Sequence, residues 1–350
     1  MPGVDVAARA GGIPAVTARF RESPDDFVVE EQLGWEPGGG GEHLFLLVRK
    51  RGLTTAEVAR RVADRAGVRT RQVSHAGLKD RQGVCIQWLS VQLPGREDPD
   101  FSPLEGEDLR ILRQVRNSRR LRIGSHAGNR FTIALRELAD PDRQWARRLE
   151  QIGLEGVPNY FGEQRFGRDN PARLLAWFRG EWQPRGRQER SLLLSTARAL
   201  LFNCLLSRRV TDGNWNDHIP GDVMMLDGSN SHFASERENE EELEQRLRSG
   251  DIHPSGPLWG RGDLPTRGKA REWEQRLQAD SPLLCRGLEE RGLMMQRRSL
   301  RLPVRELQCR HEEKHRVVLT FALPAGTYAT SVLRELCHYS EAGPLIGPLA

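Results

Sequence analysis

Cysteine and long apolar runs are both scarce in this chain of 350 residues. The five cysteines are odd in number, widely spaced and free of any Cys-x-x-Cys pair, so the sequence favours free thiols over a disulfide framework or a cysteine zinc site. The apolar stretches, such as 192–194 and 199–202, fall far short of the roughly 20 residues that a membrane-spanning helix needs. We therefore expect neither a disulfide scaffold nor a membrane protein.

The first residues also lack the features of an export signal. Residues 1–20 contain neither a basic segment nor a continuous apolar core. Together with the free thiols, this pattern predicts a protein of the reducing cytoplasm.

Lysine is rare among the basic residues. Only four of the 53 basic residues are lysines, against 48 acidic residues and a formal net charge of +5. The planar guanidinium of arginine suits phosphate groups, although a bias in genomic base composition would produce the same excess. The length allows two domains, or three, each with its own core.

Basic residues are concentrated in one part of the chain. Residues 110–148 contain eleven arginines against three acidic residues, which gives a local net charge of +8. Such a segment is typical of a surface that binds a polyanion, and the alternative is a surface that is basic for solubility alone. Residues 236–251 have seven acidic residues against three arginines, which predicts a solvated helix face.

Hydrophobic patterns predict a β-rich beginning and end around a dissimilar middle. Thr54 and Glu57 form a capping-box signal at the start of a helix. The Gly128-Asn129 dipeptide is a turn signal between two strands. Glycine-flanked Tyr160, Phe161 and Phe166 are interpreted as core residues. The predicted strands are 27–31, 43–48, the C-terminal half of 73–93, two within 120–135, and 316–323; the predicted helices are 54–65, 142–152 ending at Gly153, and a buried helix at 190–210.

The segment from His311 to His315 matches the pattern His-Glu-x-x-His. In zinc hydrolases this pattern binds metal because both histidines lie on one face of a helix. Here the residues favour a charged turn before the strand that starts at Arg316, so we expect no metal site. A zinc hydrolase is the least favoured of three functional hypotheses.

The Lys79-Asp80-Arg81 loop is a second candidate site. A carboxylate between two cations is suited to act as an anionic nucleophile or base. Sequence neighbours on an extended chain point to opposite sides, so a cation from elsewhere could be the partner of Asp80. Taken alone, the segment favours an ordinary turn with Asp80 as a turn residue between two charges.

Four segments, in order along almost the whole chain, resemble the TruD family of tRNA pseudouridine synthases. Residues 76–84 resemble the family signature A-G-x-K-D-[RK]-x-[AG]-V, and residues 159–167 match a nine-residue block that is particularly specific. The other two segments are 24–29 and 323–331. The resemblance implies an α+β fold: a pseudouridine synthase catalytic domain with a central antiparallel sheet and a cleft, formed by residues 1–154 and 303–350. An inserted α/β domain of residues 155–302 would interrupt it.

The resemblance also implies roles for individual residues. Asp80 matches the catalytic aspartate of the family, and Phe27 and Asn129 match positions associated with the substrate uridine. Tyr328 lies where the family commonly has phenylalanine and keeps the aromatic face. Arg21, just before the segment 24–29, is our candidate for the cation that partners Asp80.

The function implied by the resemblance is isomerisation of uridine 13 in tRNA to pseudouridine. The C1′–N1 bond breaks and a C1′–C5 bond forms without net redox change, so we expect no cofactor and no metal. The uridine must be turned out of the RNA, which costs a few kcal/mol and is offset by stacking and phosphate contacts. We expect tRNA as the substrate, no obligate protein partner, no membrane, and a monomer. An inert RNA-binding protein on the same scaffold is the main alternative.

Overall fold

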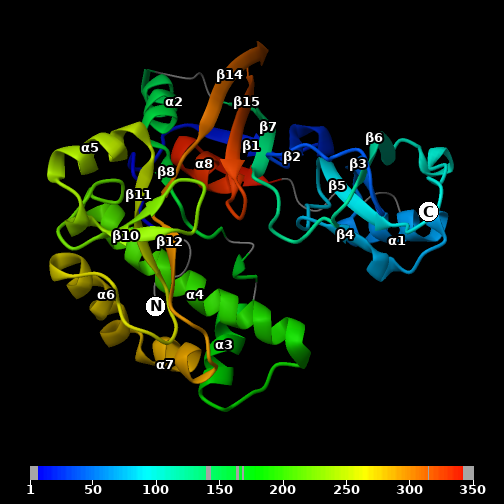
Figure 1. Ribbon diagram of the computed structural model, residues 1–350. Helices are drawn as coiled ribbons and strands as arrows, with labels where there is room; N and C mark the ends of the chain where they lie inside the picture. The colour runs from blue at the N-terminus through cyan, green and yellow to red at the C-terminus, as the bar shows by residue number, and fades with distance from the viewer. Residues whose placement is uncertain (1–6, 139–142, 163–164, 168, 314, 342–350) are drawn as a thin grey trace. The chain divides into compact units, whose positions relative to one another are not determined.

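The computed structural model describes residues 7–138, 143–162, 165–167, 169–313 and 315–341. The chain divides into two compact units, each described by itself (Figure 1). The sheet unit comprises 15–149, 304–326 and 337–350, and the helical unit comprises 1–14, 150–303 and 327–336. The predicted insertion of residues 155–302 stays a prediction.

The sheet unit is built on a ten-stranded, mainly antiparallel sheet. Its main path runs in the order β14 (Arg305–Glu313), β15 (Arg316–Pro324), β7 (Gly128–Arg136), β2 (Phe27–Gln32), β5 (Val84–Gln92), β3 (His43–Arg51) and β6 (Leu109–Asn117). Off this path, β1 (Thr17–Phe20) pairs with β7 and β16 (His338–Glu341), and β4 (Val73–His75) pairs with β5. The β2–β5 and β1–β16 pairs are parallel. The fold is α+β, as predicted.

Helix α1 (Thr55–Ala66) covers part of this sheet and is capped as the sequence predicts. The hydroxyl of Thr54 accepts from the amide of Glu57 at 3.2 Å, and the amide of Thr54 donates to the Glu57 carboxylate at 2.6 Å. The helix ends at Gly67, whose φ of 61° is the left-handed conformation that glycine adopts without a steric penalty. Buried Val58 and Val62 pack into one cluster with the apolar residues of β3 and β5.

The helical unit combines a second sheet with several helices. Its strands are β10 (His232–Ala234), β9 (Val223–Leu226), β11 (Ile252–Leu258) and β12 (Gln296–Ser299), all paired antiparallel, together with the short pair β8 (Val157–Pro158) and β13 (Arg301–Leu302). Its helices are α3 (Asn170–Phe178), α4 (Gly186–Thr211), α5 (Glu240–Ser249), α6 (Gly268–Asp280), α7 (Pro282–Glu290) and α8 (Ala329–Leu336). The boundary at residue 150 falls within α2 (Arg143–Glu155). The predicted buried helix at 190–210 is confirmed as the centre of α4.

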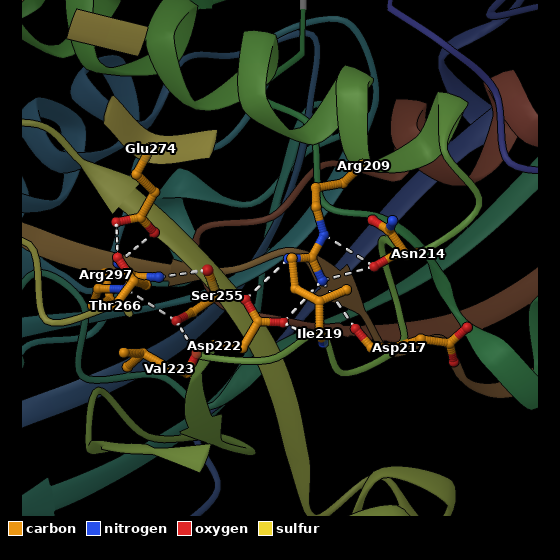
Figure 2. A network of polar contacts seen from close by, with 10 residues as sticks. All are labelled: Arg209, Asn214, Asp217, Ile219, Asp222, Val223, Ser255, Thr266, Glu274 and Arg297. Atoms are coloured by element: carbon orange, nitrogen blue, oxygen red, sulfur yellow. Dashed lines mark hydrogen bonds and ion pairs between the residues drawn. The ribbon is translucent and has the colours of Figure 1, made fainter. Parts of the chain in front are cut away.

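Two buried ion pairs connect α4 and α6 to the second sheet (Figure 2). Arg209 on α4 donates to Asp222 at 2.9 Å, and Arg297 on β12 donates to Glu274 on α6 at 2.7 Å. The backbone carbonyl of Ser255 on β11 accepts from Arg297 as well. Burial raises the pKa of Glu274, although Arg297 opposes this effect. Because each charge has a partner, both pairs hold these elements in register.

Three local predictions were wrong. The stretch 120–127 forms no strand, and Gly128 and Asn129 begin β7 instead of forming a turn. Glycine is needed at 128 because a Cβ there would lie 2.4 Å from the carbonyl oxygen of Leu323 on β15. Helix α2 continues past Gly153 and ends at Glu155, before Gly156 with its φ of 75°. Residue 142, the expected start of that helix, lies outside the described residues.

Within the described part of the chain, no helix is both long and apolar enough to cross a membrane.

Candidate active site

The loop that carries Asp80 connects β4 to β5, and buried side chains form hydrogen bonds to its backbone. The buried ammonium of Lys50 donates to the carbonyl oxygens of Asp80 at 2.6 Å and of Leu53 at 2.7 Å. The thiol of Cys85 donates to the same Asp80 carbonyl at 3.3 Å. Burial lowers the pKa of Lys50 and raises the pKa of Cys85. The loop backbone is therefore fixed while the carboxylate of Asp80 is 41% exposed.

The two cations beside Asp80 in the sequence bond elsewhere. The Lys79 side chain is only 7% exposed, and its ammonium forms an ion pair of 3.2 Å with the fully buried carboxylate of Glu31. The same ammonium donates to Oδ1 of Asn129, and the Lys79 amide donates to the Thr55 hydroxyl at 3.0 Å. Burial raises the pKa of Glu31, whereas Lys79 opposes that rise. Arg81 donates to a backbone carbonyl instead of to Asp80.

Arg21 is the cation that reaches Asp80. Its Nη2 lies 3.3 Å from Oδ2 of Asp80, so the contact predicted between these two residues is present. The Arg21 side chain is 8% exposed, and its guanidinium lies over the rings of Phe27 at 4.1 Å and Phe20 at 4.9 Å. Its Nη1 is 3.5 Å from Glu341. Because the two rings hold the guanidinium in place, its Nη2 group points at the carboxylate of Asp80.

Phe27 and Asn129 lie behind this pair. The Phe27 ring is buried, packs edge-on against Phe20, and has its face covered by Arg21, so it supports the guanidinium. A Cβ at Gly83 would lie 2.7 Å from the Phe27 carbonyl oxygen, which explains the glycine in the loop. Asn129 is also buried. The family resemblance associates both residues with the substrate uridine, and the structure gives Phe27 a covered position; the uridine roles of both residues stay predictions.

Tyr328 belongs to the other unit. It lies beside Gly162, where a Cβ would be 3.6 Å from the Tyr328 ring, and it packs against the cluster that contains Phe161. The guanidinium of Arg298 lies 4.2 Å over Phe161 in the same cluster, and burial lowers its pKa to about 10. The predicted burial of Tyr160, Phe161 and Phe166 is confirmed. The sheet unit thus contains Asp80, Arg21, Phe27 and Asn129, whereas Tyr328 lies in the helical unit.

The arginine-rich stretch is less uniform than its net charge of +8 indicates. Arg113 pairs with Glu36, Arg116 with Asp98, Arg130 with Glu306, and Arg136 with Asp26. Arg148 is buried. The exposed arginines that form no ion pair with the described acidic residues include three in the loop before β7, namely Arg119, Arg120 and Arg122.

The likeness predicted from short motifs extends to nearly the whole chain. The model of the family described as tRNA pseudouridine synthase D (TruD) matches residues 5–176 and 186–336. The chain belongs to the TruD family. It is 46% identical over 344 residues to the tRNA pseudouridine synthase D of Methylococcus capsulatus, covering 98% of this chain and 97% of that protein. It is 44% identical to the protein of the same name from Pseudomonas aeruginosa strain LESB58, with 98% and 96% covered.

A solved structure from Methanosarcina mazei, provisionally described as tRNA pseudouridine synthase D (TruD), shares the fold. Its TM-score is 0.74 at 20% sequence identity, and the match covers 95% of this chain and 96% of that chain. At this identity the likeness supports the fold class alone.

Sequence reasoning missed the buried side chains of Lys50 and Glu31, which lie under the loop of the TruD signature, residues 76–84. Lys50 ends an apolar strand segment and Glu31 lies within another, positions where a charged side chain usually faces solvent. One signal was available, because two of only four lysines, Lys50 and Lys79, belong to this site. Cys85 follows the loop directly in sequence.

Two neutral histidines lie near the same loop. Burial and the charge of Lys79 lower the pKa of His126 to about 4. Burial also lowers the pKa of His75. A Cβ at Gly77 would lie 3.7 Å from the His126 ring, so the two loops are in close contact. Both rings therefore stay uncharged at neutral pH.

The His-Glu-x-x-His segment forms no helix. His311 to Glu313 are the last residues of β14, so the charged turn expected at 311–315 is wrong for these three residues. His315 follows the residue that the structure does not describe, and its ring contacts the Leu138 carbonyl at 3.2 Å. In the described residues no group of three or more His, Cys, Asp or Glu is placed to hold a metal ion.

Proposed function

We propose that this chain isomerises uridine 13 of tRNA to pseudouridine, with Asp80 as the catalytic residue. Membership of the TruD family and the names of its relatives support the reaction class. The single observation that carries the assignment of Asp80 is its ion pair with Arg21 on an otherwise fixed loop. A half-exposed carboxylate held by a buried cation is suited to meet a nucleoside.

The chemistry needs one anionic side chain. Asp80 assists departure of uracil as the C1′–N1 bond breaks, the base rotates, and a C1′–C5 bond forms. The hydrogen on C5 is then released and N1 ends with a proton, so atoms and electrons balance within the nucleoside and water. Arg21 keeps the carboxylate oriented, and Lys50 fixes the backbone from which it projects.

The proposal assigns Phe27, Asn129 and Tyr328 to the uridine site. Phe27 acts by supporting Arg21, and Asn129 acts with Lys79 behind the loop. Tyr328 is assigned an aromatic face for the uridine. The proposal also includes a monomeric enzyme of the cytoplasm in which an inserted domain, residues 155–302, helps to position the tRNA.

The test is the conversion of Asp80 to asparagine. We expect Asp80→Asn to abolish pseudouridine formation in tRNA, measured by mass spectrometry of nuclease digests, while tRNA affinity stays within about tenfold because one neutralised carboxylate leaves most phosphate contacts intact. Asp64→Asn, on the exposed face of α1, is the matched control and should keep full activity. Full activity of Asp80→Asn would refute the assignment. Binding by the wild type without any product would favour the inert RNA-binding protein.

A further inference from the structure

Three exposed apolar side chains surround one turn next to the Asp80 loop. Leu78 is 77% exposed, Ile123 is 83% exposed and Trp35 is 40% exposed. The turn is joined to the Asp80 loop by a hydrogen bond of 2.7 Å from the Gly124 amide to the Ala76 carbonyl, and to Trp35 by one of 3.3 Å from its indole to the Ser125 carbonyl. We call Leu78, Ile123 and Trp35 the apolar rim.

Ile123 is exposed because it lies in a turn that hydrogen bonds hold in place. The Ser125 hydroxyl donates to the Arg122 carbonyl at 2.7 Å, and the Ser125 amide donates to the same carbonyl at 3.1 Å. Leu121, before the turn, is buried, and its amide donates to the Ser90 hydroxyl at 3.0 Å. Gly124 takes the φ of 78° that the turn requires. Ile123 is thus presented to solvent by a turn with defined bonds on both sides.

Leu78 and Asp80 face solvent on either side of a buried lysine. The Lys79 side chain points inward to Glu31 and Asn129. Leu78 is 77% exposed and the Asp80 side chain is 41% exposed, so both reach solvent from this loop. An exposed leucine two residues from the proposed catalytic carboxylate costs solvation free energy unless a partner covers it.

The charged residues around the apolar rim indicate which kind of partner covers it. Arg119, Arg120 and Arg122 are all exposed, and none forms an ion pair with the acidic residues that the structure describes. Apolar side chains beside unpaired arginines match an RNA strand, whose bases present apolar faces and whose phosphates are anionic. A protein partner with an apolar face would not require this cluster of cations.

We propose that the apolar rim contacts the bases that flank the target uridine, with Leu78 filling the space that the uridine leaves when it is turned out of the RNA. This inference rests on the proposed function. Apolar side chains inserted between base steps replace lost stacking and so lower the cost of unstacking. Ile123 and Trp35 then support the neighbouring bases. Leu78 is a positioning residue, because it acts on the RNA next to the reacting nucleotide.

The test compares Leu78→Ala with Leu112→Ala, an exposed leucine on β6 that lies outside the rim. We expect Leu78→Ala to lower the rate of pseudouridine formation in folded tRNA about 10- to 100-fold. On a short single-stranded RNA with the same target sequence, where the uridine needs no unstacking, it should stay within about threefold of the wild type. Leu78→Met, which keeps an apolar side chain of similar size, should restore most of the rate on folded tRNA.

A second readout does not depend on chemistry. A tRNA with 2-aminopurine next to the target uridine is bound by Asp80→Asn, so that no product forms, and its fluorescence increases when the bases unstack. We expect Leu78→Ala in this background to lose most of the increase at saturating protein, and Leu112→Ala to keep it.

Two results would overturn the inference. Equal behaviour of Leu78→Ala and Leu112→Ala on folded tRNA would show that the rim has no part in unstacking. An equal loss by Leu78→Ala on folded and single-stranded RNA would show that Leu78 supports only the loop. Failure of the proposed function itself is distinguishable, because the wild type would then form no pseudouridine in either RNA.

Discussion

Lys79 and Glu31 form an ion pair of 3.2 Å that is almost completely shielded from solvent, directly behind the loop that carries Asp80. The backbone amide of Trp88 donates to the other oxygen of Glu31 at 3.2 Å, so one oxygen of this carboxylate accepts a hydrogen bond and the other pairs with Lys79. The pair joins β2 to the signature loop. Its contribution to folding and to activity can be tested separately.

Lys79→Met should lower the free energy of unfolding by about 3–5 kcal/mol, because it leaves the carboxylate of Glu31 buried without its cation. The double variant Glu31→Leu with Lys79→Met should regain much of that loss, since it removes both charges. Urea unfolding followed by tryptophan fluorescence measures both. A loss below about 1 kcal/mol for the single variant would contradict the pairing.

Arg21→Gly tests the cation on Asp80 with little backbone disturbance, because the φ of 59° at this position suits glycine. Loss of one preorganised donor typically costs about 10²-fold or more in rate, and we expect a decrease of this size in pseudouridine formation. Millimolar guanidinium added to the assay should restore part of the rate if the vacated space over Phe27 accepts it. Unchanged activity of Arg21→Gly would refute a role for the pair.

Gly83→Ala should destabilise the protein by about 1–3 kcal/mol, because the new methyl group would lie 2.7 Å from the Phe27 carbonyl oxygen and 2.9 Å from its ring. Gly40→Ala is the control, since a Cβ there meets nothing within 4 Å, and its effect should stay within about 0.5 kcal/mol. Urea unfolding of the two variants under identical conditions decides the prediction, and equal midpoints would contradict it.

His126 makes the folded state sensitive to acid. Its pKa is lowered from 6.5 to about 4, so between these values the unfolded chain binds a proton that the folded protein does not. Stability contributed by the neutral ring is present above pH 6.5 and is lost as the pH falls towards 4. His126→Asn should therefore flatten the dependence of Tm on pH in this window.

Exposed His338→Asn serves as the control for this measurement and should leave the slope unchanged. The readout is the difference in Tm between each variant and the wild type at several pH values from 7.5 to 4, in buffers of about equal ionic strength. Parallel curves for His126→Asn and the wild type would contradict the prediction.

Local chemistry predicted the elements whose determinants lie close together in sequence. The Thr54–Glu57 capping box and the strands 27–31 and 316–323 are present, because a cap or an alternating strand is specified by neighbouring residues. The Gly128-Asn129 turn was wrong because glycine at 128 serves a close approach to Leu323, a residue distant in sequence. A dipeptide cannot distinguish these two uses of glycine.

The candidate site was predictable to a similar extent. A charged loop and its resemblance to a family signature identified Asp80, and the segment before 24–29 supplied Arg21. The burial of Lys50 and Lys79 was not predictable, because a lysine is buried only where carbonyls or a carboxylate from other strands meet it. The contact of the Arg21 guanidinium with the Phe27 ring was not predictable either, because sequence does not show which side chain covers a ring.

Cys85 gives the enzyme an internal reporter of loop motion. Its thiol lies beneath the backbone of residue 80, and burial raises its pKa, so alkylating reagents reach it only when the loop lifts away. The rate of modification of this one cysteine, followed by peptide mass spectrometry, thus measures how often the loop opens. A bound nucleic acid that covers the loop should slow this modification, so the alkylation rate of Cys85 reports whether substrate is bound.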